Sequence, residues 1–153
     1  MVEAGSYKKI LYPTDFSETS ISCLREVVGL PEFESSDFFL LHAFRLIGAD
    51  AESSNLVAAK RMLEANSINA FNKLNEDVLK NFHQRFHFLS EVGFVSDRVI
   101  SNIRDYNIDL LMLCNRMREE IYEKAGKDYQ NMLERIPCPM LLMPEFKIIG
   151  IDH

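Results

Sequence analysis

The stretch at residues 9–19 constrains the fold most, because it predicts a strand that runs directly into a helix. The apolar residues of its strand part are Ile10, Leu11 and Tyr12. Such a run is typical of a strand buried on both faces. Pro13 cannot donate to a central ladder, so we expect the strand to end there. Ser17 or Asp15 can cap the helix that follows. A ligand would bind at this carboxyl end of the strand in an open α/β sheet.

Four further apolar segments suit strands, and they alternate with helical patterns. The expected strands are residues 8–12, 37–41, 85–91, 109–113 and 140–143. The expected helices are residues 17–29, a long stretch at 55–82 that residues 66–69 can interrupt, residues 95–106, and a helix that carries Met132 and Leu133. We expect loops at residues 42–54 and 114–118. Alternating strands and helices predict a five-stranded, doubly wound parallel sheet of the α/β class.

A chain of 153 residues predicts one domain, residues 1–153, and its composition is that of a globular protein. We expect a mobile polar leader at residues 1–7 and an apolar C-terminal tail at residues 145–153. The net charge of −6 argues against a nucleic-acid or anionic-membrane surface. Nothing resembles a signal peptide, and no apolar run approaches the roughly 20 residues of a membrane span, so we expect a cytoplasmic protein.

The chain has three cysteines, which is an odd count. They are Cys23, Cys114 and Cys138. A chain of this size does not need a disulfide framework. We interpret all three as small buried or half-buried residues.

Residues 10–17, with the sequence Ile-Leu-Tyr-Pro-Thr-Asp-Phe-Ser, resemble the opening of a universal stress protein domain. Residues 40–43, 92–93, 109–113 and 137–142 resemble later strands and loops of that family. The resemblance covers about residues 8–144. It implies the strand order 3-2-1-4-5, a ligand cleft between the first and fourth strands, and a homodimer formed through the fifth strand.

The resemblance also implies where a nucleoside would bind. In ATP-binding relatives, an aspartate and the backbone after a histidine at the end of the second strand hold the nucleoside. Carried over, these positions are Pro13, Thr14, Asp15 and Ala43, and all four are compatible with that role. From the residues alone, Asp15 as a helix cap is the simpler interpretation.

The phosphate half of that site departs from the family pattern. ATP-binding relatives use Gly-x2-Gly-x9-Gly followed by Ser or Thr, because glycines let backbone N–H groups approach phosphate oxygens. The corresponding positions here are Cys114, Met117, Gly126 and Lys127, and the spacer is one residue short. Two of the three glycines and the hydroxyl are therefore missing.

Basic side chains could replace the glycines, but acidic ones balance them. The basic residues of this stretch are Arg116, Arg118, Lys124 and Lys127, and the acidic ones are Glu119, Glu120, Glu123 and Asp128. A stretch without net charge predicts a solvated helix face with ion pairs between successive turns.

No cluster of residues in the sequence predicts catalysis. His83 and His87 lie four residues apart without the glutamate of a metalloprotease motif, so we predict no metal site. His42 is interpreted as a packed or hydrogen-bonded residue at a strand end. No nucleophile, base and orienting group can be assembled from the spacing.

The sequence therefore predicts a stress-response binding or signalling module that is not an enzyme and does not bind ATP with high affinity. The alternative is an ATP-binding switch or weak ATPase with a variant phosphate loop. We expect no cofactor, a homodimer through residues 140–143, and no nucleic-acid or membrane partner. The sequence names neither the physiological ligand nor a protein partner.

Overall fold

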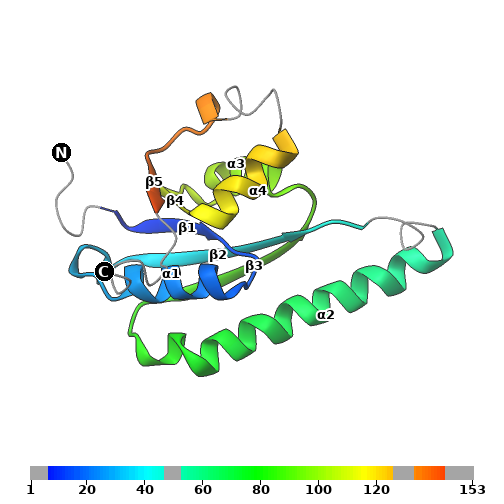
Figure 1. The fold of residues 1–153 in the computed structure, drawn as a ribbon, viewed down its shortest axis with the longest axis horizontal. Helices are drawn as coiled ribbons and strands as arrows, with labels where there is room; N and C mark the ends of the chain where they lie inside the picture. The colour runs from blue at the N-terminus through cyan, green and yellow to red at the C-terminus, as the bar shows by residue number, and fades with distance from the viewer. Residues whose placement is uncertain (1–6, 47–52, 126–132, 144–153) are drawn as a thin grey trace, which may run out of the picture.

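A computed structural model describes residues 7–46, 53–125 and 133–143, and its centre is a five-stranded parallel sheet (Figure 1). The strands are β1 (Lys9–Pro13), β2 (Asp37–Phe44), β3 (Phe86–Val92), β4 (Leu110–Cys114) and β5 (Met140–Met143). They pair in the order β3-β2-β1-β4-β5, and every pair is parallel. The predicted fold class and strand order are confirmed.

Helices cover both faces of the sheet. They are α1 (Glu18–Val28), α2 (Ser53–Asp77), α3 (Val95–Tyr106) and α4 (Asn115–Ala125), with short 3-10 helices η1 (Pro31–Phe33) and η3 (Leu79–Asn81). α1 and α2 lie on one face, and α3 and α4 lie on the other (Figure 1). This arrangement explains why β1 and β4 consist almost entirely of buried residues.

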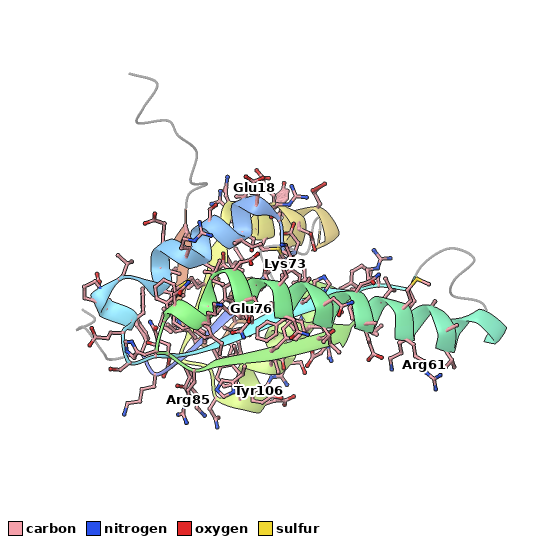
Figure 2. All side chains as sticks on the ribbon, turned by 90° about the horizontal axis from the view of Figure 1, so that it is seen from below. Glu18, Arg61, Lys73, Glu76, Arg85 and Tyr106 are labelled. Atoms are coloured by element: carbon pink, nitrogen blue, oxygen red, sulfur yellow. The ribbon has the colours of Figure 1, made fainter. Side chains whose placement is uncertain are left out.

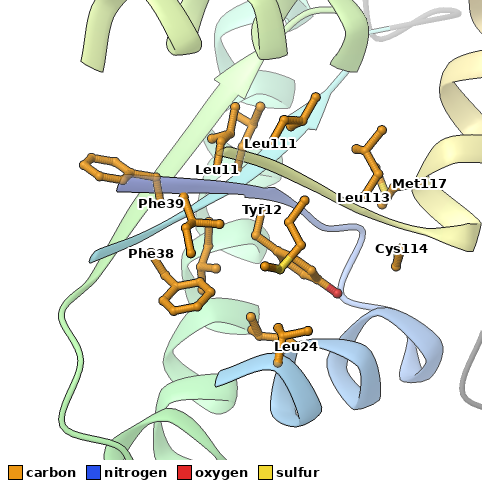
Figure 3. Close-up of a cluster of buried hydrophobic side chains, with 14 of the residues drawn as sticks. Leu11, Tyr12, Leu24, Phe38, Phe39, Leu111, Leu113, Cys114 and Met117 are labelled. Atoms are coloured by element: carbon orange, nitrogen blue, oxygen red, sulfur yellow. The ribbon is translucent and has the colours of Figure 1, made fainter. Parts of the chain in front are cut away.

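The core is built from the central strands and the inner faces of the helices. Its largest fully buried side chains include Tyr12, Phe38, Leu24, Leu111 and Leu113 (Figure 3). Burial of such side chains removes roughly 1.5–3 kcal/mol of unfavourable hydration each. The same cluster contains Cys114 and Met117, which the sequence places at the phosphate end of the cleft.

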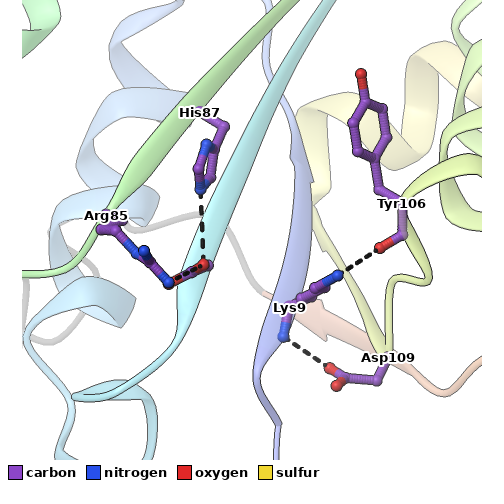
Figure 4. Close-up of polar contacts among 6 residues, drawn as sticks. Lys9, Arg85, His87, Tyr106 and Asp109 are labelled. Carbon is purple, nitrogen blue, oxygen red and sulfur yellow. Dashed lines mark hydrogen bonds and ion pairs between the residues drawn. The ribbon is translucent and has the colours of Figure 1, made fainter.

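Polar contacts join the strands at the amino end of the sheet (Figure 4). The Asp109 carboxylate accepts hydrogen bonds from the backbone N–H groups of Lys8 and Lys9, both at 3.1 Å. The Lys9 ammonium donates to the Tyr106 carbonyl at 3.2 Å. These contacts fix β1 beside the start of β4.

Asp37, which pairs with Lys9 at the start of β2, forms a second contact group at the same end of the sheet, with Arg85 and His87 (labelled in Figure 4). Its carboxylate accepts from the Arg85 guanidinium at 3.0 Å and lies 3.6 Å from His87 Nε2. His87 belongs to the edge strand β3, and His83 precedes that strand, so the two histidines do not share a helix face. Among the described residues, no group of three His, Cys, Asp or Glu side chains is placed to hold a metal ion.

Two local predictions are wrong, and the structure decides one alternative that the sequence left open. β2 continues through residues 42–44, which we expected to be a loop, because they pair in register with residues 90–92 of β3. α2 is continuous across residues 66–69, because Ser67 there is buried and bonded to the sheet. Residues 115–118 belong to α4 and are not a loop. Their side chains favour a helix, and Met117 and Ile121, one turn apart, bury its inner face.

The first half of α2 projects beyond the sheet (Figure 1). Arg61 lies on this projecting part, whereas Lys73 and Glu76 lie over the sheet (Figure 2). Among the described residues, no helix is both long and apolar enough to span a bilayer.

The cysteines have the predicted surroundings. Cys23 and Cys114 are buried, Cys138 is half-buried, and all three are free thiols. Burial raises the pKa of the Cys23 thiol to about 11, which keeps it protonated and unreactive.

Candidate functional site: the cleft between the first and fourth strands

The strand register marks the carboxyl ends of β1 and β4 as the candidate ligand site, and we call the position between these two ends the crevice. β1 pairs with β2 at five positions but with β4 only at Ile10–Leu110 and Leu11–Leu111. From β1 the chain continues to β2 and β3 on one side of β1, and it then crosses back to β4 on the other side. The strand order therefore reverses between β1 and β4. Ligands of open α/β sheets bind at such a reversal.

Hydrogen bonds hold the first wall of the crevice, the turn between β1 and α1. The backbone N–H of Thr14 donates to the Leu41 carbonyl at 2.8 Å, which fixes the turn to β2. The Thr14 hydroxyl accepts from the backbone N–H of Phe16 at 2.9 Å and shares a hydrogen bond with the Ser20 hydroxyl at 2.7 Å. Thr14 is buried, so its polar atoms are satisfied within the protein.

The sequence left open whether Ser17 or Asp15 caps α1, and the structure decides for Ser17. The Ser17 hydroxyl accepts from the backbone N–H of Ser20 at 3.2 Å. Asp15, two residues before the cap, accepts at Oδ1 from the backbone N–H of Ser17 at 3.0 Å. The second oxygen of Asp15 is therefore available for another partner.

Phe16 lies between these residues in a left-handed backbone conformation, with φ 61°. This conformation costs a side chain roughly 1–2 kcal/mol. The ring of Phe16 packs edge-on against His42, with ring centroids 5.0 Å apart, and against Phe88. The aromatic packing and the hydrogen bonds of the turn offset the strain.

Arg116, in the first turn of α4, forms an ion pair with Asp15 across the crevice. The Asp15 side chain is 19% exposed and the Arg116 side chain is 58% exposed. Burial raises the pKa of Asp15, but hydrogen bonds from Ser17 and Arg116 outweigh it and hold that pKa below its ordinary value. The carboxylate is therefore ionised at neutral pH and already has a cationic partner.

The second wall, the junction of β4 and α4, is apolar and compact. Cys114 ends β4 and is 0% exposed, and Asn115 begins α4 without an intervening loop. Met117 is 2% exposed and packs into the core with Ile121. Figure 3 shows Cys114 and Met117 within the same cluster as Tyr12 and Leu113. The side chains at the first two glycine positions of the family pattern thus contribute to the core.

A pocket of about 450 Å³ lies beside this junction, at the carboxyl ends of β2 and β3. The residues that line it include Ala43, Arg45, Gly93, Phe94, Arg116, Glu119, Glu120 and Glu123. Gly93 turns the chain with φ 138°, a conformation that favours glycine. Two arginines face three glutamates, so among the described residues the lining carries no net positive charge. Arg116 is common to the pocket and the crevice.

The eight predicted nucleotide-site positions fall into three groups. Pro13, Thr14 and Asp15 form the end of β1 and its turn, and Ala43 lies in β2 and lines the pocket. Cys114 and Met117 belong to the buried junction. Gly126 and Lys127 lie outside the described residues.

The sequence did not predict that Arg45 and Phe94 line the pocket, or that Arg116 pairs with Asp15. Arg45 follows Ala43 by two residues, a spacing that could have placed both on one side of the chain. Its guanidinium lies over the Phe94 ring, 4.1 Å from the centroid. Arg116 was expected on a solvated helix face, but it pairs with Asp15, because α4 begins immediately after β4.

His42 is hydrogen-bonded, as the sequence predicts. Its Nδ1 lies 2.7 Å from the Ser67 hydroxyl, which also accepts from Ser90 at 2.9 Å. These bonds tie α2 to β2 and β3. Burial lowers the pKa of His42, and the nearby Asp15 carboxylate only partly opposes this effect.

The fold and the cleft define a doubly wound α/β protein with a candidate ligand site at its strand-order reversal. The model of the universal stress protein family matches residues 6–144, so the chain belongs to this family. The predicted resemblance is confirmed.

Known relatives agree with this assignment. Universal stress protein MJ0577 of Methanocaldococcus jannaschii is 27% identical over 153 aligned positions, which cover 90% of this chain and 94% of that protein. A structure of MJ0577 has a TM-score of 0.72 at 22% identity and covers 92% of this chain and 98% of that chain. UspA from Lactobacillus plantarum has a TM-score of 0.68 at 15% identity, covering 90% of this chain and 97% of that one.

A third solved structure carries a ligand. A universal stress protein family protein from Arabidopsis thaliana with AMP bound has a TM-score of 0.54 at 13% identity. It covers 90% of this chain and 92% of that one. At these identities the structural comparisons establish the fold alone.

Proposed function

We propose that this protein is a binding or signalling module of the stress response whose cleft keeps the nucleoside half of a nucleotide site and lacks the triphosphate half. Membership of the universal stress protein family supports the stress-response role. The AMP-bound Arabidopsis relative supports a nucleotide as the class of ligand. Asp15 and Ala43 would contact the nucleoside, and Thr14 would hold the turn that positions Asp15.

One observation supports the proposal that the protein does not bind ATP with high affinity. β4 passes directly into α4, and the side chains of Cys114 and Met117 fill the core where a phosphate loop would need bare backbone. Glutamates at positions 119, 120 and 123 face the adjacent pocket and repel additional phosphates. High-affinity binding of a triphosphate is therefore not expected.

Calorimetry with Mg-ATP on the unmodified protein tests this proposal. We expect no ATP binding in the micromolar range and no ATP in the purified protein by mass spectrometry. A saturating ligand at 100 times its Kd would stabilise the protein by about 2.7 kcal/mol, so thermal unfolding provides a second readout. Micromolar ATP affinity would favour the alternative, an ATP-binding switch or weak ATPase.

We further propose a homodimer through β5. Leu141 and Leu142 are exposed on this edge strand, at 36% and 45%, and an exposed apolar edge is an aggregation hazard unless another chain covers it. Pairing of β5 with its copy about a two-fold axis would cover the edge.

Sedimentation at micromolar concentration should show a dimer that Leu142→Lys weakens. Val57→Lys is the matched control, because Val57 is also exposed and apolar but lies on α2. A monomeric unmodified protein, or a dimer that only Val57→Lys disrupts, would contradict an interface at β5.

A further inference from the structure

We propose that Asp15 and Arg116 form a latch across the crevice, and that a nucleoside monophosphate opens it by supplying a new partner to both residues at once. The inference rests on the proposed function, because it assumes that the nucleoside half of the cleft still binds a ligand. It adds the contact that regulates this site and the number of phosphates that the site accepts.

The latch closes the crevice from both walls. Asp15 follows β1, and Arg116 begins α4 directly after β4, so the ion pair bridges the two strands at the strand-order reversal. Asp15 Oδ1 is held by the Ser17 N–H, and Oδ2 is held by Arg116. A ligand that binds the Asp15 carboxylate therefore competes with the Arg116 guanidinium for Oδ2.

A ligand that binds only Asp15, or only Arg116, leaves the charge of the other residue without a partner. A neutral nucleoside offers hydroxyl or amine donors to Asp15 but no negative charge to Arg116. Inorganic phosphate attracts Arg116 but leaves the Asp15 carboxylate, which is mostly buried, without its cation. A molecule with sugar hydroxyls and a phosphate satisfies both residues, because arginine binds phosphate with paired, charge-assisted hydrogen bonds.

The surroundings of Arg116 favour a single phosphate. Glu119, Glu120 and Glu123 line the pocket that Arg116 shares. The Arg45 guanidinium, which also lines the pocket, already packs on the Phe94 ring. A second or third phosphate would therefore extend towards carboxylates.

Calorimetric titrations with AMP, adenosine and inorganic phosphate test the latch in the unmodified protein and in Arg116→Gln. We expect the unmodified protein to bind AMP more tightly than adenosine or phosphate. In Arg116→Gln, adenosine should bind about two- to fivefold more tightly, the range that an exposed ion pair contributes, and the preference for AMP over adenosine should disappear. Arg118→Gln is the matched control, because Arg118 donates to Asn115 at 2.6 Å on the same helix. It should keep the preference of the unmodified protein.

The ratio of AMP to adenosine affinity decides the inference. An unchanged ratio in Arg116→Gln overturns the latch, as does an equal change in Arg118→Gln or the absence of AMP binding to the unmodified protein. None of these results affects the proposed loss of ATP affinity. Conversely, micromolar ATP binding overturns the proposed function, whereas the AMP to adenosine ratio still measures the contact between Asp15 and Arg116.

Discussion

The turn between β1 and α1 and the junction between β4 and α4 make an instructive comparison. Both start at the carboxyl end of a central strand and lead into a helix, and they form opposite walls of one crevice. The turn is held by hydrogen bonds around Thr14 and Asp15. The junction is held by the buried side chains of Cys114 and Met117.

The difference shows that the two halves of a nucleotide site depend on different physical properties. The nucleoside half needs polar atoms in fixed positions, and these also stabilise the turn. The phosphate half needs a backbone without side chains, which contributes little to a core. Side chains at that half can therefore add packing energy without changing the other half.

Met117→Ala should give the largest effect, because it removes a buried side chain from the apolar junction. We expect a loss of about 2–5 kcal/mol in the free energy of unfolding, from lost burial and the cavity left behind. Urea unfolding measures it, and Met62→Ala is the control, because Met62 is 65% exposed. The control should change stability by less than about 0.5 kcal/mol. Equal effects of the two variants would refute the description of the junction as core.

The same packing bears on any attempt to restore ATP binding with the glycines of the family pattern. Replacing Cys114 and Met117 by glycine should destabilise the protein, because both side chains are buried.

Thr14→Val should give an intermediate effect at the polar turn. Valine keeps the shape but removes the hydroxyl that bonds Phe16 and Ser20, and the unpaired groups cost about 1–3 kcal/mol. Thr19→Val in α1 is the control, and we expect a change of less than about 0.5 kcal/mol there. If Thr14→Val were as neutral as its control, hydrogen bonds would not be what holds this wall.

The smallest effect should be a dependence of stability on pH that arises from His42. This residue lies in β2 and packs against Phe16 of the polar turn. Because burial lowers the pKa of His42 in the folded state, the unfolded chain binds a proton more readily. Stability is then fully present above pH of about 6.5 and decreases as the pH falls through the window between 6.5 and the folded pKa.

His42→Asn tests this window, because its amide can still bond Ser67 but does not titrate. Urea midpoints between pH 7.5 and 5.5 should decrease less in the variant than in the unmodified protein. Between pH 7.5 and 8.5 the two should run parallel, because His42 is neutral in both states. An identical slope below pH 6.5 would assign the pH dependence to other groups.

Hydrophobic patterns and turn residues are local signals, so they were sufficient for the fold class, whereas the strand order was expected only from the family resemblance. Ile10 to Tyr12 and Leu110 to Leu113 have the continuous apolar character of strands buried on both faces, and the structure buries them. Boundaries were less predictable. β2 extends to Phe44 because of its pairing with β3, and pairing is a non-local property.

At the candidate site, the sequence by itself determined which residue types occupy each half. It showed a carboxylate at Asp15, a serine at position 17 that was one of two candidate caps, and side chains in place of the first two glycines. It also showed that the charges after β4 are balanced. All of these facts can be read directly from the order of residues.

Only the tertiary structure decided what these residues do. The ion pair between Asp15 and Arg116 joins positions 101 residues apart, and it forms because β1 and β4 are neighbours and α4 begins without a loop. Met117 became a core residue for the same reason, since the direct entry into α4 turns it towards the sheet. Local patterns specify elements, but long-range packing selects which side chains meet at a cleft and which are buried beneath it.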